Sequence, residues 1–203
     1  IIEKWFSKES LENGIIKMED LINKLNLDNP YREKFEKDLQ DKINMSKDLL
    51  NNFDFEMIRK MTIMNSHGDY SVQQLIYNDN GKTTVIDFET AKKLPIIWEV
   101  MRSYSYVDEE AKNGELNIDT LVEYVKKFAK YVQLNKYLKY AAQLYLIQIV
   151  SSPFGYKQYN DDYEKKGLLE FALFRTNLCR YLYNNSKEIS TRLQKEVNSY
   201  TKV

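Results

Sequence analysis

Two aspartates lie in short motifs whose residue types suit the chemistry of phosphoryl transfer. Asp69 ends the sequence HGD (67–69), and Asp87 is the central residue of IDF (86–88), 18 residues later. A pair of carboxylates serves this chemistry because one can orient or receive the proton of an attacking hydroxyl group, while the other holds Mg²⁺ against the phosphates. Asp69 and Asp87 are therefore the candidate site residues.

A β-hairpin between the two motifs is expected to bring the aspartates together. Residues 75–77 and 83–86 are short β-favouring runs, and the segment between them contains Asn-Gly, a strong signal for a hairpin turn. A hairpin returns the end of its second strand to the place where its first strand began. Asp69 and Asp87 should consequently lie within reach of the same small ligand.

Most of the remaining sequence has the apolar periodicity of amphipathic helices. Helices are predicted over residues 11–27, from Pro30 to about Leu50 with Asn29 as the N-cap, around 98–102, over 121–132, 137–149 and 162–183, and from the N-cap Ser186 to 197. A loop is expected to begin near residue 65. No repeat or linker-like stretch divides the 203 residues, so the sequence predicts one mainly α domain that carries a small β-hairpin.

Charge and cysteine content exclude several classes of protein. The 30 basic and 30 acidic side chains cancel, so the chain has no strong field to hold a nucleic-acid backbone or an anionic membrane. One Cys and one His exclude a Cys/His zinc cluster within the chain. No apolar run reaches the roughly 18 residues that would span a bilayer. We expect a cytoplasmic protein with neither a nucleic-acid nor a membrane partner.

The two motifs and their surroundings resemble a known family. HGDYSVQQLIY (67–77) and VIDFETAKKLPIIWEVMRSY (85–104) are similar to the catalytic loop and the metal-binding segment of the aminoglycoside phosphotransferase and choline kinase superfamily, whose members are small-molecule kinases with a protein-kinase-like fold. The resemblance extends over about residues 11–183, with its motifs confined to 67–102. It implies the helical C-terminal lobe of that fold.

The resemblance also implies roles for individual residues. Asp69 would be the catalytic aspartate, Asp87 a metal ligand, and His67 a support for the loop. The family has a second metal ligand, an Asn, five residues after the catalytic aspartate, and this chain has Gln74 at that position. Because Gln is longer than Asn by one methylene, its oxygen would be displaced unless the backbone compensates for the change.

The implied activity is ATP-dependent transfer of the γ-phosphate to a hydroxyl group of a small molecule, aminoglycoside-like or other, with Mg²⁺ and ATP as cofactors of the full-length protein. In the family, an N-terminal lobe supplies a β-sheet, a phosphate-covering loop and a lysine. The 66 residues before His67 predict helices and contain one glycine, Gly14. We therefore expect this chain to be the C-terminal lobe, with the N-terminal lobe of the same protein as its partner.

Two alternatives concern the activity and the acceptor. The chain could be a non-catalytic, degenerate kinase lobe that binds a ligand or a partner protein. The candidates for an aromatic cage around a choline-like acceptor are Tyr104, Tyr106, Tyr156, Tyr159 and Tyr163. The candidates for binding a cationic aminoglycoside are Asp108, Glu109, Glu110, Asp161, Asp162 and Glu164. Such tyrosines are also common in cores, and such acidic residues are common at solvated helix ends.

Overall fold

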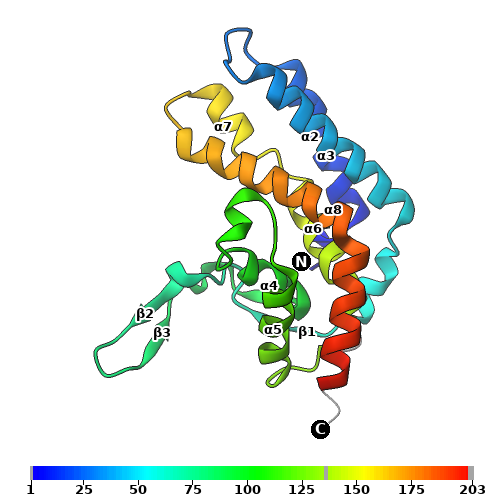
Figure 1. The fold of residues 1–203 in the computed structure, drawn as a ribbon. Coiled ribbons are helices and arrows are strands. Elements are labelled where there is room, and N and C mark those ends of the chain that lie inside the picture. The colour runs from blue at the N-terminus through cyan, green and yellow to red at the C-terminus, as the bar shows by residue number, and fades with distance from the viewer. Residues whose placement is uncertain (1, 135–136, 201–203) are drawn as a thin grey trace.

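Helices make up most of the chain, and the longest of them form its scaffold (Figure 1). The computed structural model describes residues 2–134 and 137–200. The helices are α1 (Ile2–Trp5), α2 (Lys8–Asn23), α3 (Arg32–Asn52), α4 (Ile96–Ser105), α5 (Ile118–Ala129), α6 (Ala141–Val150), α7 (Tyr156–Asp161) and α8 (Lys166–Tyr200). The strands are β1 (Ile63–Ser66), β2 (Leu75–Tyr77), β3 (Thr83–Val85) and β4 (Lys92–Pro95). The prediction of a mainly helical chain with a small hairpin is confirmed.

One hydrophobic core, which we call the first core, lies between α2, α3, α7 and the beginning of α8. Its buried residues are Ile15, Met18, Leu21, Leu25, Phe35, Leu39, Ile43, Tyr156, Tyr159, Leu169 and Ala172. The predicted helices over 11–27 and from Pro30 are thus present as α2 and α3. The assignment of Asn29 as an N-cap is wrong, because α3 begins two residues later than expected and Tyr31 precedes it. The buried Asn29 side chain instead bonds to Asn160 of α7 at 3.1 Å.

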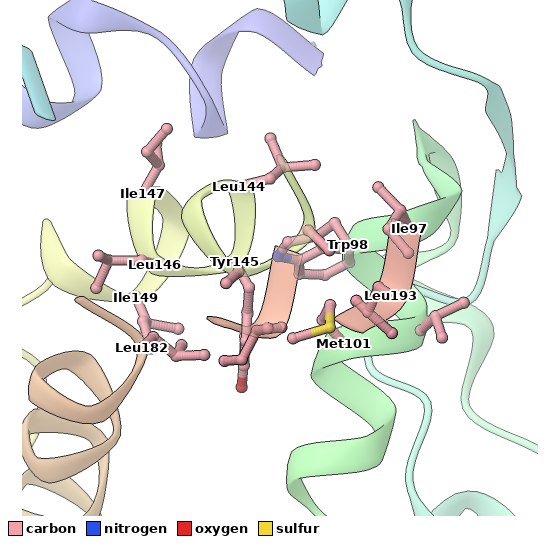
Figure 2. Packing of buried hydrophobic residues seen from close by; sticks show 14 of the residues in the cluster. Ile97, Trp98, Met101, Leu144, Tyr145, Leu146, Ile147, Ile149, Leu182 and Leu193 are labelled. Atoms are coloured by element: carbon pink, nitrogen blue, oxygen red, sulfur yellow. The ribbon is translucent and has the colours of Figure 1, made fainter. Parts of the chain in front are cut away.

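The second core lies between α4, α6 and the rest of α8 (Figure 2). Trp98 and Met101 of α4 are fully buried and point toward residues of α6, among them Leu144 and Tyr145. Leu182 and Leu193 of α8 complete this contact. Within the described ranges, no helix combines the length and the apolarity that a membrane span requires.

The strands form two separate antiparallel pairs. β2 pairs with β3, with Leu75 opposite Val85, which confirms the predicted hairpin, and this hairpin extends away from the helices (Figure 1). β1 pairs with β4, with Ser66 opposite Lys92. The second pairing was not predicted, since the sequence analysis expected only a loop near residue 65. Its effect is to close the segment that carries both motifs, so that the chain enters α4 beside the beginning of β1, where the amide of Ile96 donates to the carbonyl of Thr62 at 3.0 Å.

The prediction of two final helices is wrong, because α8 continues without interruption from Lys166 to Tyr200. Ser186 lies inside the helix, where its hydroxyl donates to the carbonyl of Tyr183 at 3.3 Å. Neither Gly nor Pro occurs between Leu168 and Val197. The buried positions Leu182, Ile189, Leu193 and Val197 keep to one face of the helix, so the second core favours a continuous helix over a break at Ser186.

Candidate active site

The loop formed by residues 67–70, which we call the HGD loop, is held at its first residue by two neighbouring segments. The Nε2 atom of His67 donates a hydrogen bond to the carbonyl of Ile86 at 2.8 Å, and Nδ1 accepts one from the amide of Asp69 at 3.4 Å. These two bonds assign the proton to Nε2. The carbonyl of His67 accepts a hydrogen bond from the Thr90 hydroxyl at 3.0 Å. His67 therefore supports the loop and is not free to act as a base.

A buried carboxylate fixes the middle of the HGD loop. Glu99 of α4 is only 4% exposed, and its Oε2 accepts a hydrogen bond from the amide of Gly68 at 2.8 Å. Its Oε1 accepts a longer bond from the amide of Tyr70 at 3.4 Å. Sequence analysis did not identify Glu99, although an acidic residue inside the apolar run of 94–101 was a usable signal.

Gly68 is required by the shape of this loop. Its φ of 84° lies in the left-handed region, which costs energy for residues with a Cβ atom. A Cβ atom at this position would also lie 2.5 Å from the carbonyl oxygen of Thr90. The close approach between the HGD loop and the segment before β4 therefore depends on glycine.

Asp69 points to the arginine that follows Glu99 by one helical turn. Arg102 donates through Nη2 to Oδ1 of Asp69, and through Nη1 to the carbonyl of Tyr70 at 3.2 Å. The guanidinium also stacks on the ring of Tyr106, 4.7 Å from its centroid. The Asp69 side chain is 43% exposed, and its Oδ2 has no hydrogen bond to the described part of the chain. One oxygen is thus oriented by Arg102 while the other is open to a ligand.

The backbone of Ile86 connects the segments that carry the three predicted site residues, Asp69, Gln74 and Asp87. Its amide donates to the carbonyl of Gln74 at 3.0 Å, and its carbonyl accepts the bond from His67. Asp87 follows directly, with φ 64° and an exposed side chain. A non-glycine residue in this conformation is strained, and such strain is frequent at functional sites. These bonds therefore place the turn into Asp87 next to the carbonyl of Gln74 and the beginning of the HGD loop.

The oxygen atoms of Asp87 and Gln74 are of the type that Mg²⁺ prefers. The Asp87 carboxylate accepts no hydrogen bond from the described residues, whereas Oε1 of Gln74 accepts one from the Ser71 hydroxyl. No group of three or more His, Cys, Asp or Glu side chains that could share a metal ion occurs within residues 2–134 and 137–200. Magnesium sites in kinases often use only one or two carboxylates, with water and substrate phosphates as the other ligands. The donor set fits such a site.

A pocket of about 330 Å³ opens beside Asp69. Gly68, Asp69, Thr90 and Arg102 line it together with residues of α1, α4, α6 and α8 and with Phe154. Asp87 and Gln74 do not line this pocket. Its volume is that of a small-molecule site, so the arrangement can present a hydroxyl group of a bound compound to Asp69.

The side chains proposed for a choline cage or an aminoglycoside site do not gather at this pocket. Of the five tyrosines only Tyr106 lines it, because Tyr156 and Tyr159 belong to the first core and Tyr104 bonds to Asn117 at 2.9 Å. Asp108 accepts hydrogen bonds from two backbone amides of its own loop. Neither set forms a site around Asp69.

No protein-family model, no characterised protein and no solved structure matches the chain. Its function is therefore inferred from the two motifs and from the geometry around Asp69.

Proposed function

We propose that the chain is the acceptor-binding, catalytic lobe of an ATP-dependent phosphotransferase that acts on a hydroxyl group of a small molecule. The observation that carries this proposal is the position of Asp69 at the edge of a ligand-sized pocket, with one carboxylate oxygen held by Arg102 and the other open. A general base must lie within hydrogen-bonding reach of the proton it removes.

Each residue of the site has a distinct role in this reaction. Asp69 accepts the hydrogen bond of the acceptor hydroxyl and receives its proton as the oxygen attacks the γ-phosphate. Glu99, His67 and Arg102 are positioning residues, since they act through the HGD loop or through the Asp69 carboxylate. Asp87 and Gln74 would hold Mg²⁺, which neutralises the charge of the phosphates when it is bound.

The nucleotide requires groups beyond those around Asp69. The described residues before His67 form α1, α2, α3, a 3₁₀ turn and β1, which pairs with β4. Among these elements no sheet of their own is available to cover a nucleotide. We expect an N-terminal lobe of the same protein to supply the adenine site and a phosphate-binding lysine.

A specific observation supports a second candidate, a degenerate lobe that binds ligands without catalysis. Arg102 pairs with the carboxylate of Asp69, and the carboxamide oxygen of Gln74 is already bonded to Ser71. Both groups would then stabilise the loop instead of serving a reaction.

The test compares Asp69→Asn, Asp87→Asn and Gln74→Asn in the full-length protein, with Mg²⁺ titrated against the rate of phosphate transfer from ATP to a panel of hydroxyl compounds. Asp69→Asn should lower turnover by about 10²-fold or more with little change in nucleotide affinity. Asp87→Asn should weaken Mg²⁺-dependent nucleotide binding as well. Gln74→Asn should preserve or raise activity. Unchanged rates and Mg²⁺ dependence in both aspartate variants would favour the non-catalytic lobe.

A further inference from the structure

The charges of the pocket beside Asp69 do not balance. Among the described residues, the charged side chains that line it are Asp69, Arg102 and Arg175, which gives one negative and two positive charges. Asp69 and Arg102 form an ion pair, so the guanidinium of Arg175 is left over. A cationic acceptor would be repelled by this pocket, whereas an anionic group would find a counter-charge.

Arg175 has no partner of opposite charge in the described ranges. It lies on α8, is partly buried, and its guanidinium lies over the ring of Phe171 at 5.4 Å from the centroid. By contrast, the donors of Arg102 are used by Asp69 and Tyr70. A partly buried guanidinium without an anion retains donors for a bidentate bond to a carboxylate or phosphate, and such bonds are strong.

The electrostatic surroundings of Arg175 are consistent with an unbalanced positive charge. Burial raises the pKa of the nearby Tyr145 hydroxyl, and the charges of Arg175 and Arg102 oppose that increase. Lys42 is also close enough for the charge of Arg175 to add to the lowering of its pKa, which burial dominates. Lys42 and Tyr145 therefore both lie within electrostatic range of the Arg175 guanidinium.

Aromatic residues make up six of the thirteen described residues that line the pocket. Trp5, Trp98, Tyr106, Tyr145, Phe154 and Phe171 line it. The ring centroids of Phe154 and Phe171 lie 5.9 Å apart at an interplanar angle of 83°, and Phe171 also contacts the guanidinium of Arg175. Aromatic rings in the wall offer faces and edges against which an aromatic ligand can pack.

We propose that this pocket binds an aromatic compound that carries a carboxylate, with the carboxylate on Arg175 and a hydroxyl group toward Asp69. The position of the hydroxyl rests on the proposed function, whereas the recognition of an aromatic anion does not. Arg175 is then the residue that selects acceptors by their charge.

Binding can be measured directly, because both tryptophans of the chain, Trp5 and Trp98, line the pocket and their fluorescence should report its occupancy. Three probes share a benzyl group and a hydroxyl group but differ in charge: 3-phenyllactate is anionic, 3-phenyl-1,2-propanediol is neutral and phenylalaninol is cationic. We expect 3-phenyllactate to bind at least about tenfold more tightly than the diol, and phenylalaninol to bind most weakly.

Arg175→Gln should remove the preference for 3-phenyllactate, and Arg175→Lys should keep part of it, because Lys retains the charge but not the planar fork. Arg32→Gln is the matched control, since Arg32 lies on α3 in a partly exposed ion pair with Glu36 and outside the pocket. Circular dichroism of each variant reports whether the fold is kept. Absence of 3-phenyllactate binding at millimolar concentration, tighter binding of phenylalaninol, or equal affinity in wild type and folded Arg175→Lys and Arg175→Gln would overturn the proposal.

The same probes separate this inference from the proposed function. Arg175-dependent binding of 3-phenyllactate without phosphate transfer in the full-length protein would support the pocket assignment and contradict the phosphotransferase. Phosphate transfer to phenylalaninol or to aminoglycosides in preference to 3-phenyllactate would support the phosphotransferase and overturn the assignment of Arg175.

Discussion

Replacement of Glu99 by Gln is the most direct test of how the HGD loop is held. The substitution keeps the shape of the side chain but removes its charge and replaces one carboxylate oxygen with the NH₂ group of a carboxamide. The buried carboxylate accepts the amides of Gly68 at 2.8 Å and Tyr70 at 3.4 Å. A glutamine can accept only one of these two bonds through its oxygen and must direct an N–H donor at the other amide.

The expected loss can be estimated from these two bonds. A hydrogen bond to a charged acceptor contributes about 1.5–3 kcal/mol and a neutral one about 1 kcal/mol, so conversion of the Gly68 bond costs about 1 kcal/mol. An amide left without an acceptor costs a further 1–3 kcal/mol. Relief of the cost of burying a charge offsets part of this sum. We expect a net loss of about 2 kcal/mol, which corresponds to a melting temperature lower by about 4–8 °C for a chain of this size.

Urea denaturation and amide hydrogen exchange together measure this effect. Glu115→Gln is the control, since Glu115 is exposed. In Glu99→Gln the amides of Gly68 and Tyr70 should exchange at least about tenfold faster, while the amide of Leu121, bonded to Asn117 in α5, should reflect only the global change. If Glu99→Gln matched Glu115→Gln within about 0.5 kcal/mol and the loop amides exchanged as in wild type, Glu99 would not hold the loop.

Three further predictions concern stability. Gly68→Ala should lower the free energy of unfolding by about 2 kcal/mol or more, because the added Cβ would approach the Thr90 carbonyl. Gly81 has a similar φ of 76° but open space around it, so Gly81→Ala should lower the free energy of unfolding by about 1 kcal/mol. Equal losses in urea denaturation would contradict the close approach. Trp98→Ala should cost about 3–5 kcal/mol because the indole is fully buried, and a loss below about 1 kcal/mol in the same assay would contradict its place in the second core. Burial lowers the pKa of Lys42 from 10.5 to about 8, so between these pH values the unfolded chain binds more protons than the folded chain. The free energy of unfolding of wild type should therefore rise with pH over this range, by about 3 kcal/mol in total relative to Lys42→Met. Below pH 8 the difference should be constant, and a difference that stays flat up to pH 10.5 would show that the ammonium group is not desolvated.

Local signals were sufficient for part of the fold. The Asn-Gly turn at residue 81 and the β-favouring runs on either side predicted the β2–β3 hairpin, because a hairpin is determined by neighbouring residues. Helical periodicity predicted α2 and α3 for the same reason. The β1–β4 pair was missed, since Ile63 and Pro95 are distant in the sequence and neither strand alternates clearly. The predicted helix start at Ser186 was wrong, because a good N-cap residue is also tolerated inside a helix when the buried face continues.

The candidate site was predicted only in its motif residues. The motifs pointed to Asp69 and Asp87, but Glu99 and Arg102 lie on a helix whose apolar spacing indicated packing alone. Their role depends on the β1–β4 pair, which brings α4 beside the HGD loop and was not predicted. Arg175 was missed because the sequence does not indicate which arginine lacks a carboxylate partner. The residues of the site that come from distant elements could not be found before the elements were assembled.

The continuity of α8 has a consequence for the cooperativity of unfolding. At about 1.5 Å per residue its 35 residues extend roughly 50 Å, and they include Leu169 of the first core and Val197 of the second. Neither core can melt without fraying a helix on which the other depends, so both should unfold in one two-state transition. Arg175 lies where α8 passes from one core to the other. The free energy of a ligand bound there should therefore stabilise the whole chain against unfolding instead of one end of it.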